Sequence, residues 1–167
     1  MSKSEDEIVL FPGITGFRYA SEVGPRRTEV AEFRRVVLEG ATSKLGYRVS
    51  GFDVGVESSV RSYYQALLED SRTGNAIQLL LNPFGNILAT ALDDQRIPGF
   101  LSYDIKFVET SPPLRSAFGD TWSVPPLRSL HRRLTPEDLA RLNGTELYQV
   151  RYWGPETVGQ VIFNYWD

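Results

Sequence analysis

The sequence contains no cysteine and a single histidine, and these shortages exclude several kinds of chemistry. Without cysteine the chain cannot form a disulfide, a thiolate metal site or a cysteine nucleophile. A zinc site needs several His, Cys or carboxylate ligands, and serine catalysis needs a base with an orienting acid; His131 is the one imidazole for either. Glycine-rich loops that cradle phosphates are also missing. We therefore predict no metal centre, no cofactor and no catalytic residues.

Long apolar runs are missing as well. No stretch approaches the roughly 18 or more consecutive apolar residues of a membrane-spanning helix. The opening residues 1–7 are polar and acidic, unlike a secretory signal. We expect a cytoplasmic protein without membrane contact, and a chain free of cysteine fits that reducing compartment.

Lysine is scarce, because only Lys3, Lys44 and Lys106 stand among the 18 basic residues. A strong bias toward arginine is what GC-rich coding produces and favours a bacterial source, although it could equally reflect arginine chosen for ion pairs. The net charge is −3 and the isoelectric point about 5.3. This balance argues against general binding of nucleic acid and mildly favours a basic partner.

The clearest pattern in the chain is helical. Apolar residues recur every three or four positions between residues 29 and 45, which is the spacing of one helical face. They are Val30, Phe33, Val37, Ala41 and Leu45. We predict an amphipathic helix over 29–45 that Gly46 ends with a left-handed cap. Gly40 would cost this helix about 1 kcal/mol relative to alanine.

From Tyr47 to Phe107 the apolar period changes to two, which indicates strands. The extended stretches are 47–56, 60–68, 76–81, 87–92 and 101–107. Gly51 marks a bulge in the first of them, and Asn82-Pro83-Phe84-Gly85 predicts a hairpin turn between the third and fourth. The sum is an antiparallel meander of four or five strands. Two further short extended pieces are expected between Ile8 and Tyr19.

The stretch from Thr110 to Arg133 is rich in proline and shows no sustained period. We interpret it as an irregular excursion at 110–133 from one domain that spans residues 1–167. Loops of this length inside a compact domain are uncommon and are often functional.

The end of the chain predicts a helix-strand-helix segment. Thr135-Pro136-Glu137-Asp138 is a helix start with a capping box, and Asn143-Gly144 would end that helix. The aromatic stretch from Glu146 to Trp153 resembles a strand, and Gly154-Pro155 breaks it. A last helix should place Val158, Val161, Ile162 and Tyr165 on one face. The predicted fold is therefore α+β: an N-terminal amphipathic helix packed on the meander, with this apolar segment completing the core.

Two sets of residues are candidates for recognition of a partner, and each has a plain structural alternative. The basic cluster before the Thr135 helix could bind an acidic patch or a phosphate, or could be a solvated run. The tryptophans could be interface hot spots or core. The candidates are Trp122, Arg128, His131, Arg132, Arg133, Trp153 and Trp166.

Carboxylates offer an alternative of another class. Asp93 or Asp94 together with Asp104-Ile105-Lys106 could form a nuclease-like site, in which carboxylates hold magnesium and the lysine stabilises a phosphate. Asp53 and Glu57 are further candidates for a cleft at the edge of the sheet. Alternating charges on the solvent-exposed face of a strand produce the same pattern without any catalytic role.

Two functions therefore remain open at the level of sequence. The first is a non-enzymatic intracellular protein-binding module, such as an inhibitor or immunity-type protein that masks a toxin or effector. The second is an enzyme that acts on a small molecule or on nucleic acid through carboxylates in a sheet-edge cleft. A structural or oligomer-forming subunit is a third possibility, and the sequence does not set the oligomeric state.

Overall fold

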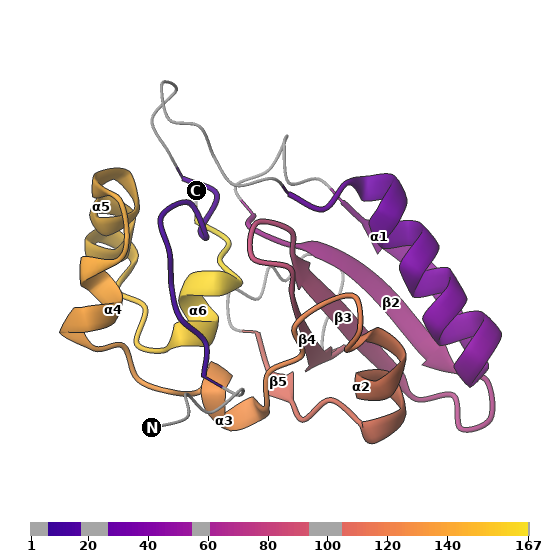
Figure 1. The fold of residues 1–167 in the computed structure, drawn as a ribbon. Helices are drawn as coiled ribbons and strands as arrows, with labels where there is room; N and C mark the ends of the chain where they lie inside the picture. Colours follow the sequence, from indigo (N-terminus) through magenta and orange to yellow (C-terminus); the bar gives the residue numbers. More distant parts are fainter. Residues whose placement is uncertain (1–6, 18–26, 55–60, 94–104, 167) are drawn as a thin grey trace.

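In the computed structural model, which describes residues 7–17, 27–54, 61–93 and 105–166, the chain has an α+β fold (Figure 1). Its strands are β1 Tyr47–Asp53, β2 Tyr64–Asp70, β3 Ala76–Asn82, β4 Ile87–Leu92 and β5 Phe107–Val108. Its helices are α1 Val30–Val37, the π-helix η1 Leu38–Lys44, α2 Pro112–Phe118, α3 Leu127–Leu130, α4 Pro136–Ala140, α5 Gly144–Trp153 and α6 Val158–Ile162.

The predicted meander is confirmed. The strands form a 5-stranded sheet in the order β1-β2-β3-β4-β5, and every neighbouring pair is antiparallel. Parts of the predicted strands, at residues 55–56, 60 and 101–104, lie outside the described residues. A sheet built from sequential neighbours needs only short connections, which is why an alternating pattern and turn residues were sufficient to predict it.

Local signals in this region act as predicted. Gly46 has a φ of 71°, the left-handed conformation that ends the preceding helix. The register between β1 and β2 shifts just before Gly51, which is the expected bulge. In the hairpin turn, Asn82 Oδ1 accepts the backbone N–H groups of Phe84 and Gly85 at 3.0 and 2.8 Å. The Asn82 side chain therefore closes the turn.

The predicted helix over 29–45 is confirmed, with a change of type along its length. Val30–Val37 form the α-helix α1, and Leu38–Lys44 continue it as the π-helix η1. In this second half the apolar residues Val37, Ala41 and Leu45 follow each other at a constant spacing of four. Repeated steps of four fit a turn wider than that of an α-helix, because they keep the apolar residues in one row.

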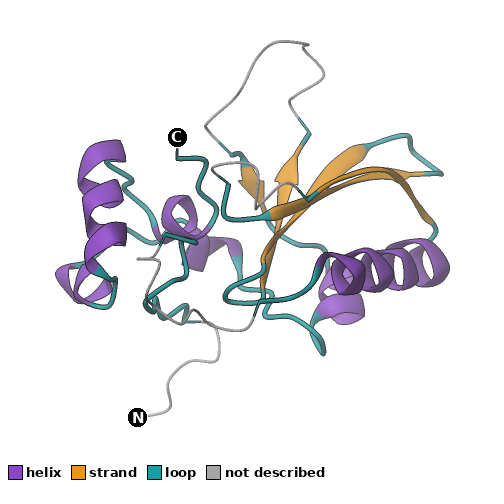
Figure 2. Ribbon diagram, turned by 90° about the horizontal axis from the view of Figure 1, so that it is seen from above, coloured by secondary structure: helices purple, strands orange, loops and turns teal. Residues whose placement is uncertain are grey.

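One face of the sheet is covered by α1, η1 and α2, which lie together on one side of the strands in Figure 2. Phe33 is at the centre of this first core, and its ring centroid is 5.4 Å from that of Tyr64 and 5.9 Å from that of Trp122. The other large buried members are Val37, Leu68, Leu79, Leu81, Leu88, Leu114 and Phe118. The packing of the helix on the sheet is as predicted.

The opposite face is covered by the N-terminal segment, α3, α6 and the end of the chain. Leu80 and Ala89 contribute to this second core, whereas Leu79, Leu81 and Leu88 contribute to the first. Strands β3 and β4 are therefore buried on both faces, which explains the unbroken apolar run Leu79-Leu80-Leu81. Among the residues that close the second core are Val158, Val161, Ile162, Phe163 and Trp166. The docking of the chain end, predicted from its apolar character, is confirmed.

The predicted strand from Glu146 to Trp153 is wrong, because these residues belong to α5. Asn143 does not simply end the previous helix; it caps the next one by accepting the N–H of Glu146, whose carboxylate returns a bond to the Asn143 N–H. This capping box starts a helix in spite of the tyrosines and valine that favour a strand. The C-terminal segment is therefore helical throughout α4, α5 and α6.

Two smaller corrections concern helix boundaries. The last helix begins at Val158, where Thr157 and Gln160 form a capping box, and it ends before Tyr165. The proline-rich stretch 110–133 contains α2 and α3, which are 7 and 4 residues long. Helices this short show no periodic pattern, so an irregular excursion was predicted in their place.

The prediction that the chain forms one domain stays an interpretation.

The N-terminal segment does not form the predicted strands, because its backbone is held by side chains instead. Glu146 is 0 % exposed, and its Oε1 accepts the N–H groups of Gly13 and Thr15, both at 3.0 Å. The same oxygen accepts the Thr15 hydroxyl at 2.7 Å, and Oε2 accepts the N–H of Asn143 at 2.9 Å. Asn143 in turn donates to the carbonyl of Phe17 at 3.0 Å.

Buried amide groups hold the same segment from the other side. Asn82 is 0 % exposed and donates to the carbonyls of Ile14 and Ile162, both at 2.8 Å. Asn164 donates to the carbonyl of Thr15 at 3.2 Å. In Figure 1 this segment, in indigo, runs between α6 on one side and α4 and α5 on the other. We call the set Asn82, Asn143, Glu146 and Asn164 the polar clamp.

The close approach of Gly40 to Phe118 yields a first test. A Cβ at position 40 would lie 2.5 Å from Cε1 of Phe118, whose ring is fully buried and stacked on Trp122. We expect Gly40→Ala to lower the free energy of unfolding by about 1–2 kcal/mol, because overpacking outweighs the gain in helix propensity. Gly51→Ala, where a Cβ meets open space, is the control in urea denaturation. A Gly40→Ala variant as stable as the parent would contradict this packing.

The polar clamp yields a second test. Both carboxylate oxygens of Glu146 accept N–H groups. In Glu146→Gln an NH2 group replaces one of these oxygens, so two hydrogen-bond donors would face each other there. We expect a loss of about 2–3 kcal/mol of unfolding free energy, the range for buried hydrogen bonds to a charged group. Thermal melting should show a Tm lower by about 4–10 °C, whereas the exposed Glu137→Gln should shift it little. Equal melting of the two variants would show that the clamp contributes no stability.

Candidate functional site

The tryptophan in the middle of the predicted excursion is a core residue. Trp122 is 3 % exposed and packs between Phe33 and Phe118, with ring centroids 5.9 and 5.7 Å away. Its side chain is therefore covered by α1 and α2. Trp122 therefore has the core packing that was the alternative to its role as a partner-binding residue.

The residues of the basic cluster have different environments in the structure. Arg132 faces inward and donates from both terminal nitrogens to the Asp138 carboxylate, at 2.7 and 2.9 Å. It also donates to the carbonyl of Ile8 at 3.2 Å. Arg132 therefore ties the first turn of α4 to the N-terminal segment, and its side chain, which is 30 % exposed, stays a predicted partner contact.

The other members of the cluster stay at the surface. Arg128, His131 and Arg133 are exposed. The His131 ring packs edge-on against Phe107 at 6.4 Å, and the backbone of Arg133 pairs with that of Thr157. They remain candidates for contact with a partner.

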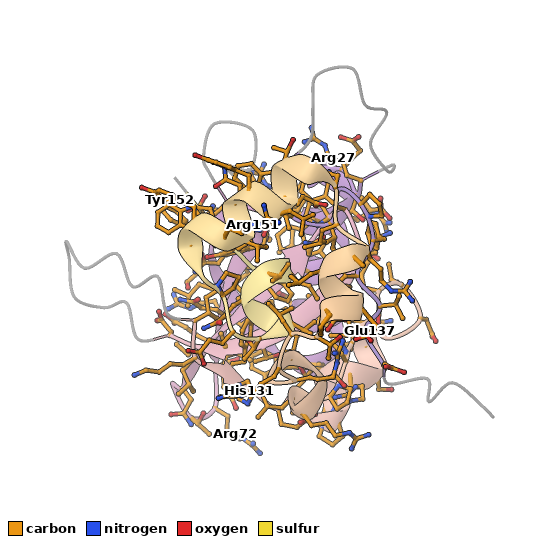
Figure 3. The ribbon with its side chains drawn as sticks, turned by 90° about the vertical axis from the view of Figure 1, so that its left-hand side faces the viewer. Arg27, Arg72, His131, Glu137, Arg151 and Tyr152 are labelled. Carbon is orange, nitrogen blue, oxygen red and sulfur yellow. The ribbon has the colours of Figure 1, made fainter. Side chains whose placement is uncertain are left out.

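A surface of which the sequence analysis singled out only Trp153 lies on α5. Tyr148 and Tyr152, one helical turn apart, are 66 % and 70 % exposed, and Trp153 is 36 % exposed. The opposite side of the helix carries Glu146 and Val150, which are buried. Figure 3 shows Tyr152 projecting from the outer end of α5, with His131 on another part of the same face. We call Tyr148, Tyr152 and Trp153 the α5 aromatic surface.

Next to this surface is a groove of about 230 Å³. It is lined by residues 153–156 at the end of α5, by Ile105 and by Phe107 of the edge strand β5. Residues 163–166 and Gln160 complete the lining. We call this feature the C-terminal groove. It brings together two sequence candidates, Trp153 and Trp166, although Trp166 is only 6 % exposed.

The tryptophan rings of the groove are held in place before any ligand arrives. The Trp153 indole N–H donates to Gln149 Oε1 at 3.1 Å, and the Tyr152 ring packs edge-on against it at 5.2 Å. The Trp166 ring packs on Phe17 at 5.9 Å. Binding of a ligand to these rings would therefore cost little side-chain entropy, because the rings are already ordered.

Tyr148 and Tyr152 could have been found from the sequence only if the segment had been recognised as a helix. On a helix their spacing of four places them together and away from Glu146 and Val150, whereas on a strand all four residues would share a face. The signal that decides is the pair Asn143 and Glu146, an N-cap followed by an acid three residues later.

The carboxylates proposed for an enzyme do not come together in the described part of the chain. Asp53 ends β1 and forms an ion pair with Arg61, whereas Asp93 follows β4 and accepts from Gln78. In this antiparallel order those positions are at opposite ends of the sheet. Glu57, Asp94 and Asp104 lie outside the described residues. The described residues of the nuclease-like pattern therefore form no carboxylate pair.

Within residues 7–17, 27–54, 61–93 and 105–166, no group of three or more His, Asp or Glu side chains could hold a metal ion. In the same residues no helix is both long and apolar enough to cross a membrane. The chain matches no known protein family, no curated protein and no solved structure. The function must therefore be argued from the surface itself.

The ion pair of Arg132 and Asp138 yields a test of pH dependence. Burial alone would raise the pKa of Asp138, but hydrogen bonds from Arg132 and Thr135 outweigh it and hold this pKa below its ordinary value. A lowered folded pKa gives stability that is present above the unfolded value of about 3.9 and is lost as the pH falls through the folded pKa. Asp138→Asn should therefore lower stability at pH 6 and flatten its decline between pH 5 and pH 3.

The measurement is the urea midpoint at each pH for the parent, for Asp138→Asn and for Glu137→Gln. Glu137 is the adjacent exposed carboxylate and serves as the control. A pH profile of Asp138→Asn parallel to that of the parent would exclude this pair as a source of acid sensitivity.

Proposed function

We propose that this protein is a non-enzymatic protein-binding module that docks its partner on the α5 aromatic surface and the C-terminal groove. The observation that carries the proposal is the exposure of Tyr148, Tyr152 and Trp153 on a helix whose other side is fixed in the core. Tyrosine and tryptophan are the residues that most often supply the binding energy of protein interfaces.

Leaving these rings in water has a cost that supports a binding role. Each large aromatic side chain gains roughly 1.5–3 kcal/mol when it moves from water into a packed environment. The cores of this protein are built from other residues, so folding does not recover that energy for Tyr148 or Tyr152. A partner that covers them would recover it, and the rigid helix that carries them would keep the entropy cost of binding low.

The proposed class of partner is a basic protein. The net charge of −3 gives a weak long-range attraction for a basic surface. An inhibitor or immunity-type protein that masks a toxin or effector fits this charge and the lack of a converging catalytic group among the described residues. The cytoplasmic location and the bacterial source are part of the same proposal and rest on the cysteine-free, arginine-rich sequence.

The proposal is tested by removing the aromatic surface without disturbing the core. Tagged parent protein and a Tyr148→Ala/Tyr152→Ala variant would be used to capture partners from the native lysate, and the captured protein would then be purified. We expect the variant to bind that protein at least ten-fold more weakly in calorimetry, because each hot-spot residue contributes more than about 1 kcal/mol. Its Tm should stay close to that of the parent, since both side chains are exposed.

Leu38→Ala is the matched control, because Leu38 is 44 % exposed but lies on η1, at the other face of the sheet. It should bind as the parent does. Unchanged affinity of the double tyrosine variant, or failure of the parent to retain any partner, would refute the proposed docking surface.

A further inference from the structure

The lining of the C-terminal groove indicates which side chain of a partner would enter it, and this step rests on the proposed function. Among the described residues of the lining, Glu156 is the one with a formal charge at neutral pH. It is exposed, and its carboxylate makes no ion pair or hydrogen bond with any described residue. A free carboxylate beside aromatic rings attracts a cation and disfavours an anion.

A second residue of the lining, Asn164, carries a partial negative charge on its side-chain oxygen. Asn164 is 2 % exposed, and while its Nδ2 donates to the carbonyls of Thr15 and Val161, its Oδ1 has no hydrogen-bond partner among the described residues. The partial negative charge of this oxygen is therefore not compensated by a donor. Since it lies in a buried, weakly screened position, it adds to the negative potential of the groove.

The rings of the groove favour a cation with a soft, spread charge. Trp153, Trp166 and Tyr165 all line it, and the faces of such rings attract cations by their quadrupoles. A guanidinium is planar, stacks on aromatic faces and is more weakly hydrated than an ammonium. Its several N–H groups could also donate to Glu156 while the plane lies against a ring. Arginine therefore fits this lining better than lysine.

The size of the groove also favours one inserted side chain. Its volume of about 230 Å³ is smaller than the roughly 300–1,000 Å³ of pockets that enclose drug-sized ligands. Arg133 is a nearby cation to consider as a competitor, because its backbone pairs with that of Thr157, next to Glu156. No ion pair joins Arg133 to Glu156, so the carboxylate is available.

We propose that the C-terminal groove receives the guanidinium of an arginine side chain from the protein partner. The guanidinium stacks on the exposed Trp153 ring and pairs with Glu156, while Tyr148 and Tyr152 pack on the residues around it. The arginine is then the central anchor of the interface, where the docked partner covers it and excludes water.

The preference of the groove is measured directly with a probe. Nα-acetyl-L-arginine N-methylamide is titrated into the protein at low ionic strength, and the indole N–H signals are followed by NMR. We expect saturable shifts at Trp153 and Trp166 with a Kd in the millimolar range, roughly 1–10 mM for so small a ligand. Trp122 is an internal control, because it is buried in the core on the other face of the sheet.

Matched ligands and variants decide the chemistry. The citrulline derivative has nearly the same shape without the charge and should give no saturable shift; the lysine derivative should bind more weakly than the arginine derivative. Glu156→Gln should weaken the arginine probe about five-fold, the effect of losing one exposed ion pair. Glu137→Gln removes an equal charge near the start of α4, outside the groove, and should change nothing. Equal binding of the citrulline or lysine derivative, or equal effects of the two variants, would overturn the proposal.

The same variants separate this inference from the proposed function. If the captured partner binds Glu156→Gln as tightly as it binds the parent while the double tyrosine variant fails, the docking surface stands and the arginine anchor is wrong. If no partner is retained, the proposed function fails, and the probe titration still decides whether the groove selects a guanidinium. Loss of partner affinity in Glu156→Gln, together with loss when one partner arginine becomes glutamine, would support both.

Discussion

The fold depends on one buried carboxylate. Glu146 is 0 % exposed, and its oxygens accept N–H groups from the N-terminal turn and from the cap of its own helix. A carboxylate can be buried at acceptable cost only when such donors surround it. Asn82 and Asn164 supply the opposite polarity, donors for the carbonyls of the same segment. An irregular stretch without strand or helix thereby has its buried backbone groups satisfied.

This polar clamp also determines what α5 presents to solvent. Glu146 fixes the rotation of the helix because its side chain must face the N-terminal segment. Val150, one turn later, then faces the second core, and the sides occupied by Tyr148 and Tyr152 face outward. The left-handed Gly154 ends the helix beside the chain end that forms the groove. The proposed interface and the buried network are thus two sides of one helix.

The aromatic residues are divided between the two cores and the surface. The first core takes Phe33, Phe118 and Trp122 in contact with one another, and the second takes Phe163 and Trp166. Trp153 is left at the border between core and solvent, where its ring is oriented by Gln149 and Tyr152. A ring that is both exposed and oriented is well suited to recognition, because binding need not order it.

What the sequence by itself determined was local. The spacing of apolar residues in α1, the alternation and turns of the meander, and the capping box of Thr135 and Asp138 each involve neighbours along the chain, so their physics is readable there. Tertiary structure alone decided that Trp122 is buried while Trp153 is exposed, since the difference comes from contacts distant in sequence. Tertiary structure also decided that Glu146 is buried, whereas the predicted strand would have left its side chain exposed to solvent. Glu146 contacts residues more than 130 positions away, and no local pattern encodes a partner at that distance.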